Sequence, residues 1–160
     1  DYQLFLERFK FYLRHHCSLY AFALLPNHYH FLLRVHDNEA GSRFSQQFMR
    51  FVLSYTNKIN FKMNRNGSLF LARFRRIKVD TEDYLKRLVY YIHHNPVKHN
   101  VTSDYKTYYY SSYRIYLSDK PTALARDETI DFYGGLADFI DYHNHFHDED
   151  IIKKLILEDD

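Results

Sequence analysis

Two histidines, His28 and His30, lie one residue apart in the otherwise apolar run LLPNHYHFLLRV, residues 24–35. The run has the composition of a buried β-strand, and residues i and i+2 of a strand point to the same face. The two imidazoles should therefore stand side by side, and neutral imidazole is a common ligand of divalent metal ions. The pair predicts half of a metal site, although a chain with 11 histidines also contains such pairs by chance.

A second pattern lies in YLKRLVYYIHHNPVKHN, residues 84–100, where Tyr91 and Asn95 are one helical turn apart. A tyrosine hydroxyl beside a metal ion can attack a phosphodiester and form a covalent phosphotyrosine bond. The carboxamide oxygen of Asn95 could complete a ligand set begun by two histidines. Packing is the competing interpretation, because Tyr91 is one of 16 tyrosines and Asn95 directly precedes a proline. The residue pattern alone favours packing.

Charge is distributed unevenly along the chain, although the formal net charge is only +2. Residues 43–114 hold 14 Lys and Arg against 4 Asp and Glu, whereas residues 115–160 hold 4 against 12. The middle segment has the sign of a surface that binds polyanions, and the C-terminal segment has the opposite sign.

The remaining composition limits the class of protein. A length of 160 residues fits one domain, and the single cysteine, Cys17, excludes an internal disulfide framework. No apolar run approaches the length of a membrane span, so we expect no membrane partner and a cytoplasmic, nucleoid-associated location.

The elements that would position these residues follow from periodicity and turn signals. Apolar spacing predicts helices over residues 1–16, 44–64 and 80–96, with Asp80, Thr81 or Asp83 near the third N-terminus and Pro96 at its end. Residues 18–25 and 28–35 read as a hairpin with a tight turn at Pro26-Asn27, and residues 68–79 as a basic strand. A last helix is expected over residues 129–142, broken at Gly134-Gly135.

The ordered set of motifs resembles a known family. LLPNHYHFLLRV resembles the His-hydrophobe-His signature of the HUH endonuclease superfamily. YYIHHNPVKHNV followed by SSYRIYL resembles the tyrosine-helix block of its single-tyrosine transposases, especially the REP-associated tyrosine transposase branch. The similarity extends over residues 5–117 and includes GSLFLARFRRIKVDTEDYLKRL.

The resemblance implies an α+β fold, with a ferredoxin-like antiparallel sheet, helices packed on it and the HUH pair on a central strand. It implies a catalytic domain over residues 1–117, lacking the N-terminal strand usual in the family, and an acidic helical extension over residues 118–160. His28, His30 and Asn95 would bind Mg²⁺ or Mn²⁺, and Tyr91 would be the nucleophile. The implied reaction is cleavage of single-stranded DNA near a hairpin or palindrome, leaving a 5′-phosphotyrosine bond and a 3′-hydroxyl that can rejoin strands.

The basic middle segment then predicts a DNA groove in which cations contact phosphates and aromatic rings stack on unpaired bases. The candidate DNA-binding residues are Arg43, Arg50, Lys58, Arg73, Arg75, Arg76 and Lys78.

Several alternatives stay open at this stage. Tyr90 is adjacent to Tyr91, but it points about 100° away around the helix, which favours Tyr91. The resemblance also admits a domesticated DNA-hairpin binding protein without catalytic activity, and it leaves a homodimer open. His143, His145 and His147 alternate in the acidic segment, but in a helix they would not converge on a metal.

Overall fold

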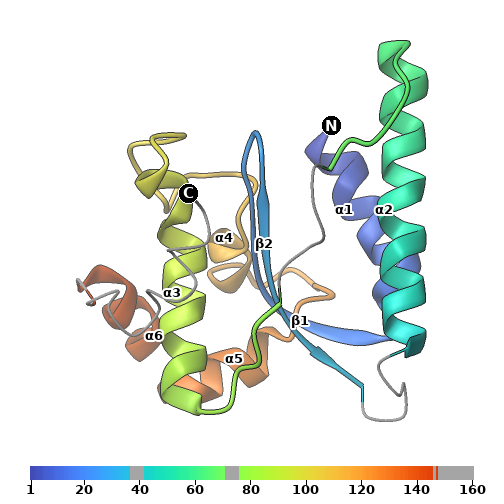
Figure 1. The fold of residues 1–160 in the computed structure, drawn as a ribbon. Coiled ribbons are helices and arrows are strands. Elements are labelled where there is room, and N and C mark those ends of the chain that lie inside the picture. Colours follow the sequence, from blue (N-terminus) through green and yellow to red (C-terminus); the bar gives the residue numbers. More distant parts are fainter. Residues whose placement is uncertain (37–41, 71–75, 146, 148–160) are drawn as a thin grey trace. The chain divides into compact units, whose positions relative to one another are not determined.

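The fold was analysed in a computed structural model, which describes residues 1–36, 42–70, 76–145 and 147 (Figure 1). These residues form six helices and a two-stranded antiparallel sheet, which confirms the α+β class. The elements in chain order are α1 (Tyr2–Leu13), β1 (Cys17–Leu24), β2 (Tyr29–Val35), α2 (Ser42–Met63), α3 (Glu82–Lys98), α4 (Tyr113–Tyr116), α5 (Arg126–Tyr133) and α6 (Leu136–Asn144). In the described ranges no helix is long and apolar enough to cross a membrane.

The chain divides into two compact units. Unit 1 comprises residues 1–18 and 34–76, and unit 2 comprises residues 19–33 and 77–160. The predicted boundary at residue 117 does not coincide with a break in packing. The side chain of Tyr20 donates a hydrogen bond to Glu128 and that of Tyr133 donates one to the Lys86 carbonyl, so residues on both sides of 117 pack together.

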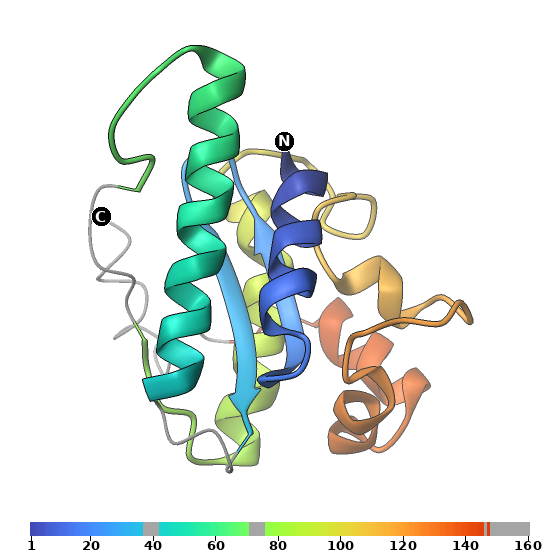
Figure 2. The ribbon, with the colours of Figure 1, turned by 90° about the vertical axis from the view of Figure 1, so that its right-hand side faces the viewer.

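Unit 1 is built on two helices that lie side by side (Figure 2). The buried residues of α1 are Phe5, Phe9 and Leu13, whose spacing by four places them on one face. Phe5 and Phe9 both contact the buried ring of Phe51 on α2, edge to face, with ring centroids 4.9 and 5.8 Å apart. Asn64, at a φ of 49°, adopts the left-handed conformation just after α2 ends.

The hairpin has the tight turn that Pro26-Asn27 predicted. The Leu25 N–H donates to the His28 carbonyl at 2.9 Å, which closes a two-residue turn between β1 and β2. His28 therefore lies at the turn, directly before β2, and His30 is the second residue of β2. Because the turn fixes the register, both imidazoles keep a defined place at the start of the second strand.

The sheet is smaller than a ferredoxin-like sheet. In the described residues β2 pairs with β1 alone, and β1 has isolated bridges on its other side to Ser111 and Leu124. The histidine pair therefore lies next to an edge of the described sheet rather than on a central strand. The strand expected over residues 68–79 is absent from its described ends, 68–70 and 76–79, and its middle lies outside the described residues.

Thr81 is the N-cap residue of helix α3, and its hydroxyl accepts a hydrogen bond from the Tyr84 N–H at 3.2 Å. The prediction that Pro96 ends this helix is wrong, because α3 continues to Lys98. Pro96 lies in the last turn and its carbonyl accepts hydrogen bonds from the N–H groups of Val101 and Thr102. The proline at this position removes the hydrogen bond that an N–H there would donate to the Ile92 carbonyl, yet the helix runs two residues past it.

The helix predicted near residue 129 is two helices, α5 and α6, divided at Gly134 and Gly135 as expected. Both glycines have positive φ values, 93° and 137°, a conformation that favours glycine. Phe139 and His143 are the buried residues of α6.

A chain of neutral hydrogen bonds joins α6 to α3 through two buried histidines. The His143 Nδ1–H donates to the Phe139 carbonyl at 2.8 Å, so His143 Nε2 is the acceptor of the 2.9 Å bond from His93 Nδ1–H. His93 Nε2 then accepts from the Ser112 hydroxyl at 2.7 Å. Because every ring nitrogen is used with both rings neutral, neither histidine can gain a proton without breaking the chain.

Burial lowers the pKa of His143 from 6.5 to about 3, and it lowers the pKa of His93, also by burial and then by the neighbouring His143. Below pH 6.5 these two histidines therefore bind protons in the unfolded chain but not in the folded protein, so the free energy of unfolding falls as the pH falls. We predict that the free energy of unfolding, measured by urea denaturation, decreases by up to about 1.4 kcal/mol per pH unit for each of these histidines between about pH 6.5 and pH 4.

His143→Gln should reduce that pH dependence, whereas His145→Gln, which alters an exposed histidine just after α6, should leave it unchanged. If His143→Gln fails to fold, the ring of His143 in the unaltered protein can be followed by NMR. A His143 ring that protonates near pH 6.5 would contradict the prediction.

Candidate metal and tyrosine site

His28 and His30 lie side by side in unit 2, as their spacing predicted. Their ring centroids are 5.1 Å apart, and the rings are nearly perpendicular. The Nδ1 of His28 is 2.8 Å from the side-chain oxygen of Asn27, which can only accept, so Nδ1 carries the proton. The lone pair of His28 is therefore on Nε2, the nitrogen that points away from Asn27.

The Nε2 of His28 faces Asn95 on α3. The distance from His28 Nε2 to Asn95 Oδ1 is 3.3 Å, although the two residues are 67 positions apart in the sequence. With the proton of His28 on Nδ1, this contact brings together two lone pairs. A cation between them, or a second proton on the ring, would turn the contact from repulsive to attractive.

Asn95 is itself unusual, because its side chain is fully buried. Its Nδ2 has no hydrogen-bond partner among the residues that the structure describes. Leaving a buried amide group without a hydrogen-bond partner costs roughly 1–3 kcal/mol of stability. Rotating the amide by 180° would let Nδ2 donate to His28, so an experiment has to separate the two orientations.

Tyr91 lies beside the second histidine. The ring centroids of His30 and Tyr91 are 5.7 Å apart, and Tyr91 is one turn before Asn95 on α3. The ammonium group of Lys98 lies 5.0 Å from the centre of the Tyr91 ring. The structure thus brings His28, His30, Asn95 and Tyr91 together within unit 2.

Tyr90 occupies a different face of α3. Its ring stacks on His94 at 4.1 Å and contacts Tyr142 and His147 edge to face. This environment includes α6 and not the histidine pair. The geometry therefore favours Tyr91 over Tyr90 as the tyrosine of the site.

Sequence reasoning did not single out Asn27 or Lys98 beside the site, and it gave His99 no role. Asn27 orients His28, Lys98 approaches Tyr91, and the His99 ring lies 4.7 Å from the His28 ring. Lys98 and His99 follow Tyr91 by seven and eight residues, which is the same helical face. That signal was present, but it was lost when the helix was ended at Pro96.

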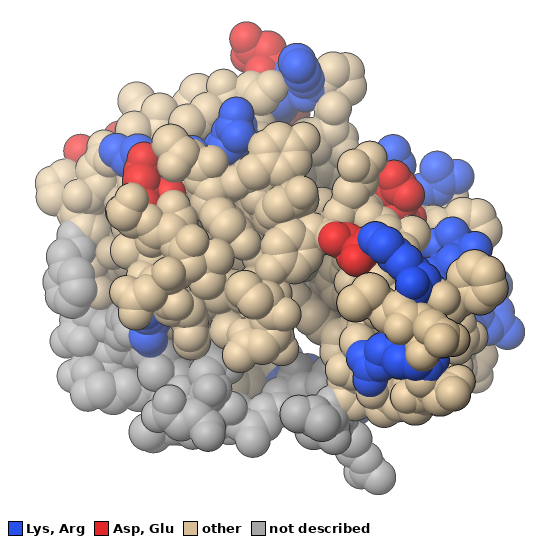
Figure 3. All heavy atoms as spheres, turned by 90° about the horizontal axis from the view of Figure 1, so that it is seen from above, with Lys and Arg blue, Asp and Glu red and all other residues tan. Residues whose placement is uncertain are grey.

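Some of the candidate DNA-binding residues are described and exposed. Arg43, Arg50 and Lys58 lie on α2 in unit 1, and Lys and Arg side chains gather on the α1–α2 side of the molecule (Figure 3). Arg76 and Lys78 are exposed in irregular chain, whereas Arg73 and Arg75 lie outside the described residues.

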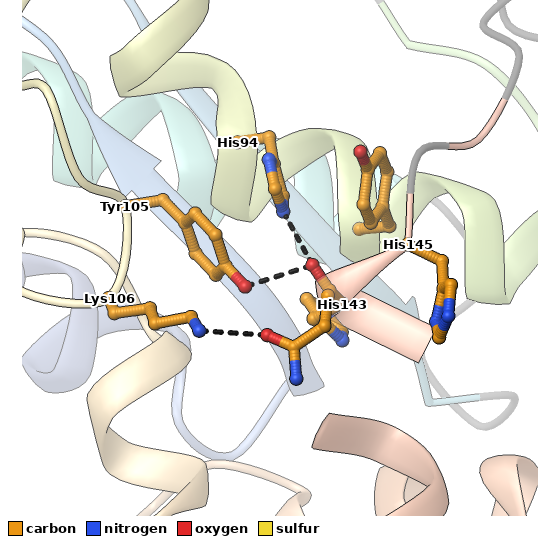
Figure 4. Close-up of a pocket in the computed structure, with 7 residues that line it drawn as sticks. His94, Tyr105, Lys106, His143 and His145 are labelled. Carbon is orange, nitrogen blue, oxygen red and sulfur yellow. Dashed lines mark hydrogen bonds between the residues drawn. The ribbon is translucent and has the colours of Figure 1, made fainter. Parts of the chain in front are cut away.

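A pocket of about 300 Å³ lies between α3, α6 and the segment of Tyr105 (Figure 4). Its polar groups contact one another. The Tyr105 hydroxyl and His94 Nε2 both donate to the His143 carbonyl, at 2.9 and 3.2 Å, and Lys106 donates to the Asn144 side chain at 2.8 Å. His94, through its own hydrogen bond, and His93, through His143, therefore hold α6 in place.

The ligands of the candidate site suit a hard or borderline divalent cation. Two ligands at right angles around Mg²⁺, each about 2.1 Å from it, are about 3 Å apart, close to the observed 3.3 Å between His28 Nε2 and Asn95 Oδ1. A metal-bound histidine usually donates its other N–H to an oxygen, as His28 does to Asn27. No group of three or more His, Cys, Asp or Glu that could hold a metal ion converges in the described ranges.

Substitutions of Asn95 separate a metal ligand from a hydrogen-bond donor. Asn95→Asp keeps an oxygen ligand and removes the N–H donor, whereas Asn95→Leu removes both. We predict that Mn²⁺ affinity, measured by calorimetry, is retained or increased in Asn95→Asp and reduced at least about tenfold in Asn95→Leu. Unchanged Mn²⁺ affinity in Asn95→Leu and in His28→Ala would show that the metal site is elsewhere.

The orienting role of Asn27 gives an independent prediction. Asn27→Ala should weaken Mn²⁺ binding by about 10–100-fold, because the Nδ1–H of His28 loses its acceptor. Asn57→Ala, which alters an exposed asparagine of α2, is the matched control. Equal affinities for the two variants would contradict the assigned orientation of His28.

Comparisons with protein-family models, with curated proteins and with solved structures found no match for this chain. The function of the site is therefore argued from its own residues, together with the resemblance of the His-hydrophobe-His and tyrosine-helix motifs.

Proposed function

We propose that this chain is a metal-dependent endonuclease and strand transferase for single-stranded DNA, of the HUH single-tyrosine transposase type. The proposal includes a ferredoxin-like relationship of its fold, Mg²⁺ or Mn²⁺ as cofactor, and hairpin or palindromic DNA as substrate. One observation carries it: His28, His30, Asn95 and Tyr91, chosen from two separate sequence motifs, lie in one cluster.

The chemistry follows from the residues of the cluster. The Tyr91 oxygen would form a bond to phosphorus as the bond from phosphorus to the 3′ oxygen breaks, giving a 5′-phosphotyrosine and a free 3′-hydroxyl. The phenolic proton leaves and the 3′ oxygen takes one up, so no net proton is consumed. A bound Mg²⁺ or Mn²⁺ would supply Lewis-acid polarisation of the scissile phosphate. Because the ester energy is kept in the phosphotyrosine bond, a 3′-hydroxyl can attack it and rejoin strands.

Lys98 supports the negative charge that this reaction develops. Its ammonium group is 5.0 Å from the Tyr91 ring centre, so it places a positive charge beside the proposed nucleophile. It would also attract the phosphate that has to approach Tyr91.

A second candidate function has a specific observation in its favour. Tyr91 is only 2% exposed, so a phosphate reaches its hydroxyl only if neighbouring side chains move. A DNA-hairpin binding protein that has the same residues but no catalytic activity would tolerate this burial. Formation of a covalent adduct distinguishes the two functions.

The experiment is incubation of the protein with labelled hairpin DNA bearing a single-stranded flank, with and without Mn²⁺, followed by denaturing electrophoresis. We predict a covalent protein–DNA adduct that requires Mn²⁺. The adduct should be absent from Tyr91→Phe and His28→Ala, because the first lacks the nucleophilic oxygen and the second lacks a metal ligand.

Tyr90→Phe is the matched control, since it removes a hydroxyl from the adjacent residue on another face of α3. It should retain the adduct. An adduct that persists in Tyr91→Phe and disappears in Tyr90→Phe would contradict the nucleophile assignment. DNA binding without an adduct in the unaltered protein would favour the silent binding protein.

A further inference from the structure

A hollow of about 600 Å³ lies on unit 1, and no residue of the candidate site lines it. It is formed by one face of α2 and by Tyr12 of α1. Its lining alternates cations with apolar and aromatic side chains, namely Tyr12, Arg50, Leu53, Asn57, Lys58 and Phe61. We name these six residues the α2 groove.

The apolar side chains of the α2 groove are unusually exposed. Phe61 is 89% exposed and Leu53 is 55% exposed, although both are large and apolar. The two side chains are eight residues apart on one helix face and lie beside two cations, which makes them a mixed apolar and basic patch that a ligand could cover.

The cations of the α2 groove are available for a ligand. Neither Arg50 nor Lys58 forms an ion pair or a hydrogen bond with any residue of the described ranges. Helix α2 carries four basic residues and no acidic residue. A second copy of the chain seated on this helix through the same face would bring like charges together, which disfavours self-association.

We infer that the α2 groove binds an unpaired nucleic-acid strand, with Arg50 and Lys58 on phosphates and Phe61 stacked on a base. Unpaired bases expose their faces, and aromatic rings interleaved with cations are the usual way to hold them. A duplex hides those faces, so Phe61 would contribute nothing to its binding. The choice of DNA over RNA rests on the proposed function; the groove itself stands on its own residues.

The test is fluorescence anisotropy with a labelled thymidine oligonucleotide, carried out with EDTA on the full chain bearing Tyr91→Phe, so that no chemistry occurs. Phe61→Ala should weaken binding about tenfold and leave the salt dependence unchanged, because stacking carries no charge. Arg50→Ala and Lys58→Ala should each reduce the slope of log affinity against log salt by about 0.7, the value for one phosphate contact on a single strand.

Tyr109→Ala and Lys10→Ala are the matched controls, since both residues are exposed and neither lines the groove. They should bind like the parent protein. The Phe61→Ala effect should vanish on a duplex of the same length, and tighter binding of the matching RNA would overturn the choice of DNA.

An unchanged oligonucleotide affinity in Phe61→Ala would overturn the inference. Sedimentation gives a second such outcome: an unaltered protein that is a dimer and a Phe61→Ala variant that is a monomer, with the same affinity for DNA. These results are separable from the proposed function. Failure to form an adduct, with groove binding intact, would remove the catalytic proposal alone. An adduct formed normally, with no groove effect, would remove the α2 groove alone.

Discussion

The contact between His28 Nε2 and Asn95 Oδ1 is the interaction on which the account depends. Two lone pairs face each other at 3.3 Å, because the hydrogen bond to Asn27 has placed the His28 proton on the far side of the ring. Such a contact is unfavourable unless a cation or an extra proton lies between the atoms. The buried and unpartnered Nδ2 of Asn95, within the described part of the chain, adds a second cost at the same residue. A divalent cation between the two atoms would offset the first cost, whereas a turned amide, with Nδ2 donating to His28, would remove both costs without a metal.

The surrounding structure holds the two atoms in place from both sides of α3. On one side, the two-residue turn closed by Leu25 and His28 sets the position of the first histidine. On the other side, His93 and His143 lock α3 to α6 through a chain of neutral hydrogen bonds. Tyr91 and Asn95 lie on α3 between these two sets of contacts, and both belong to the run of buried residues in this helix. A rigid support of this kind is what a catalytic cluster needs, since small displacements of its groups are costly.

Much of this arrangement could be predicted from the sequence. The periodicity predicted α1, α2 and the hairpin, and the resemblance of two motifs to a known family selected His28, His30, Tyr91 and Asn95, which lie together. The rest depends on contacts that no local pattern encodes. Lys98 was not singled out, and His99 was given no role, because Pro96 is usually a helix end, yet α3 continues past it. His93 could not be identified as a core residue, because its partners Ser112 and His143 are 19 and 50 positions away.

Anomalous diffraction from crystals grown with Mn²⁺ tests the central claim most directly. The account predicts an anomalous peak within bonding distance of His28 Nε2, His30 and Asn95 Oδ1, with the hydroxyl of Tyr91 nearby and Nδ1 of His28 still bonded to Asn27. A fully occupied Mn²⁺ elsewhere, with the Asn95 amide turned so that Nδ2 donates to His28, would contradict it.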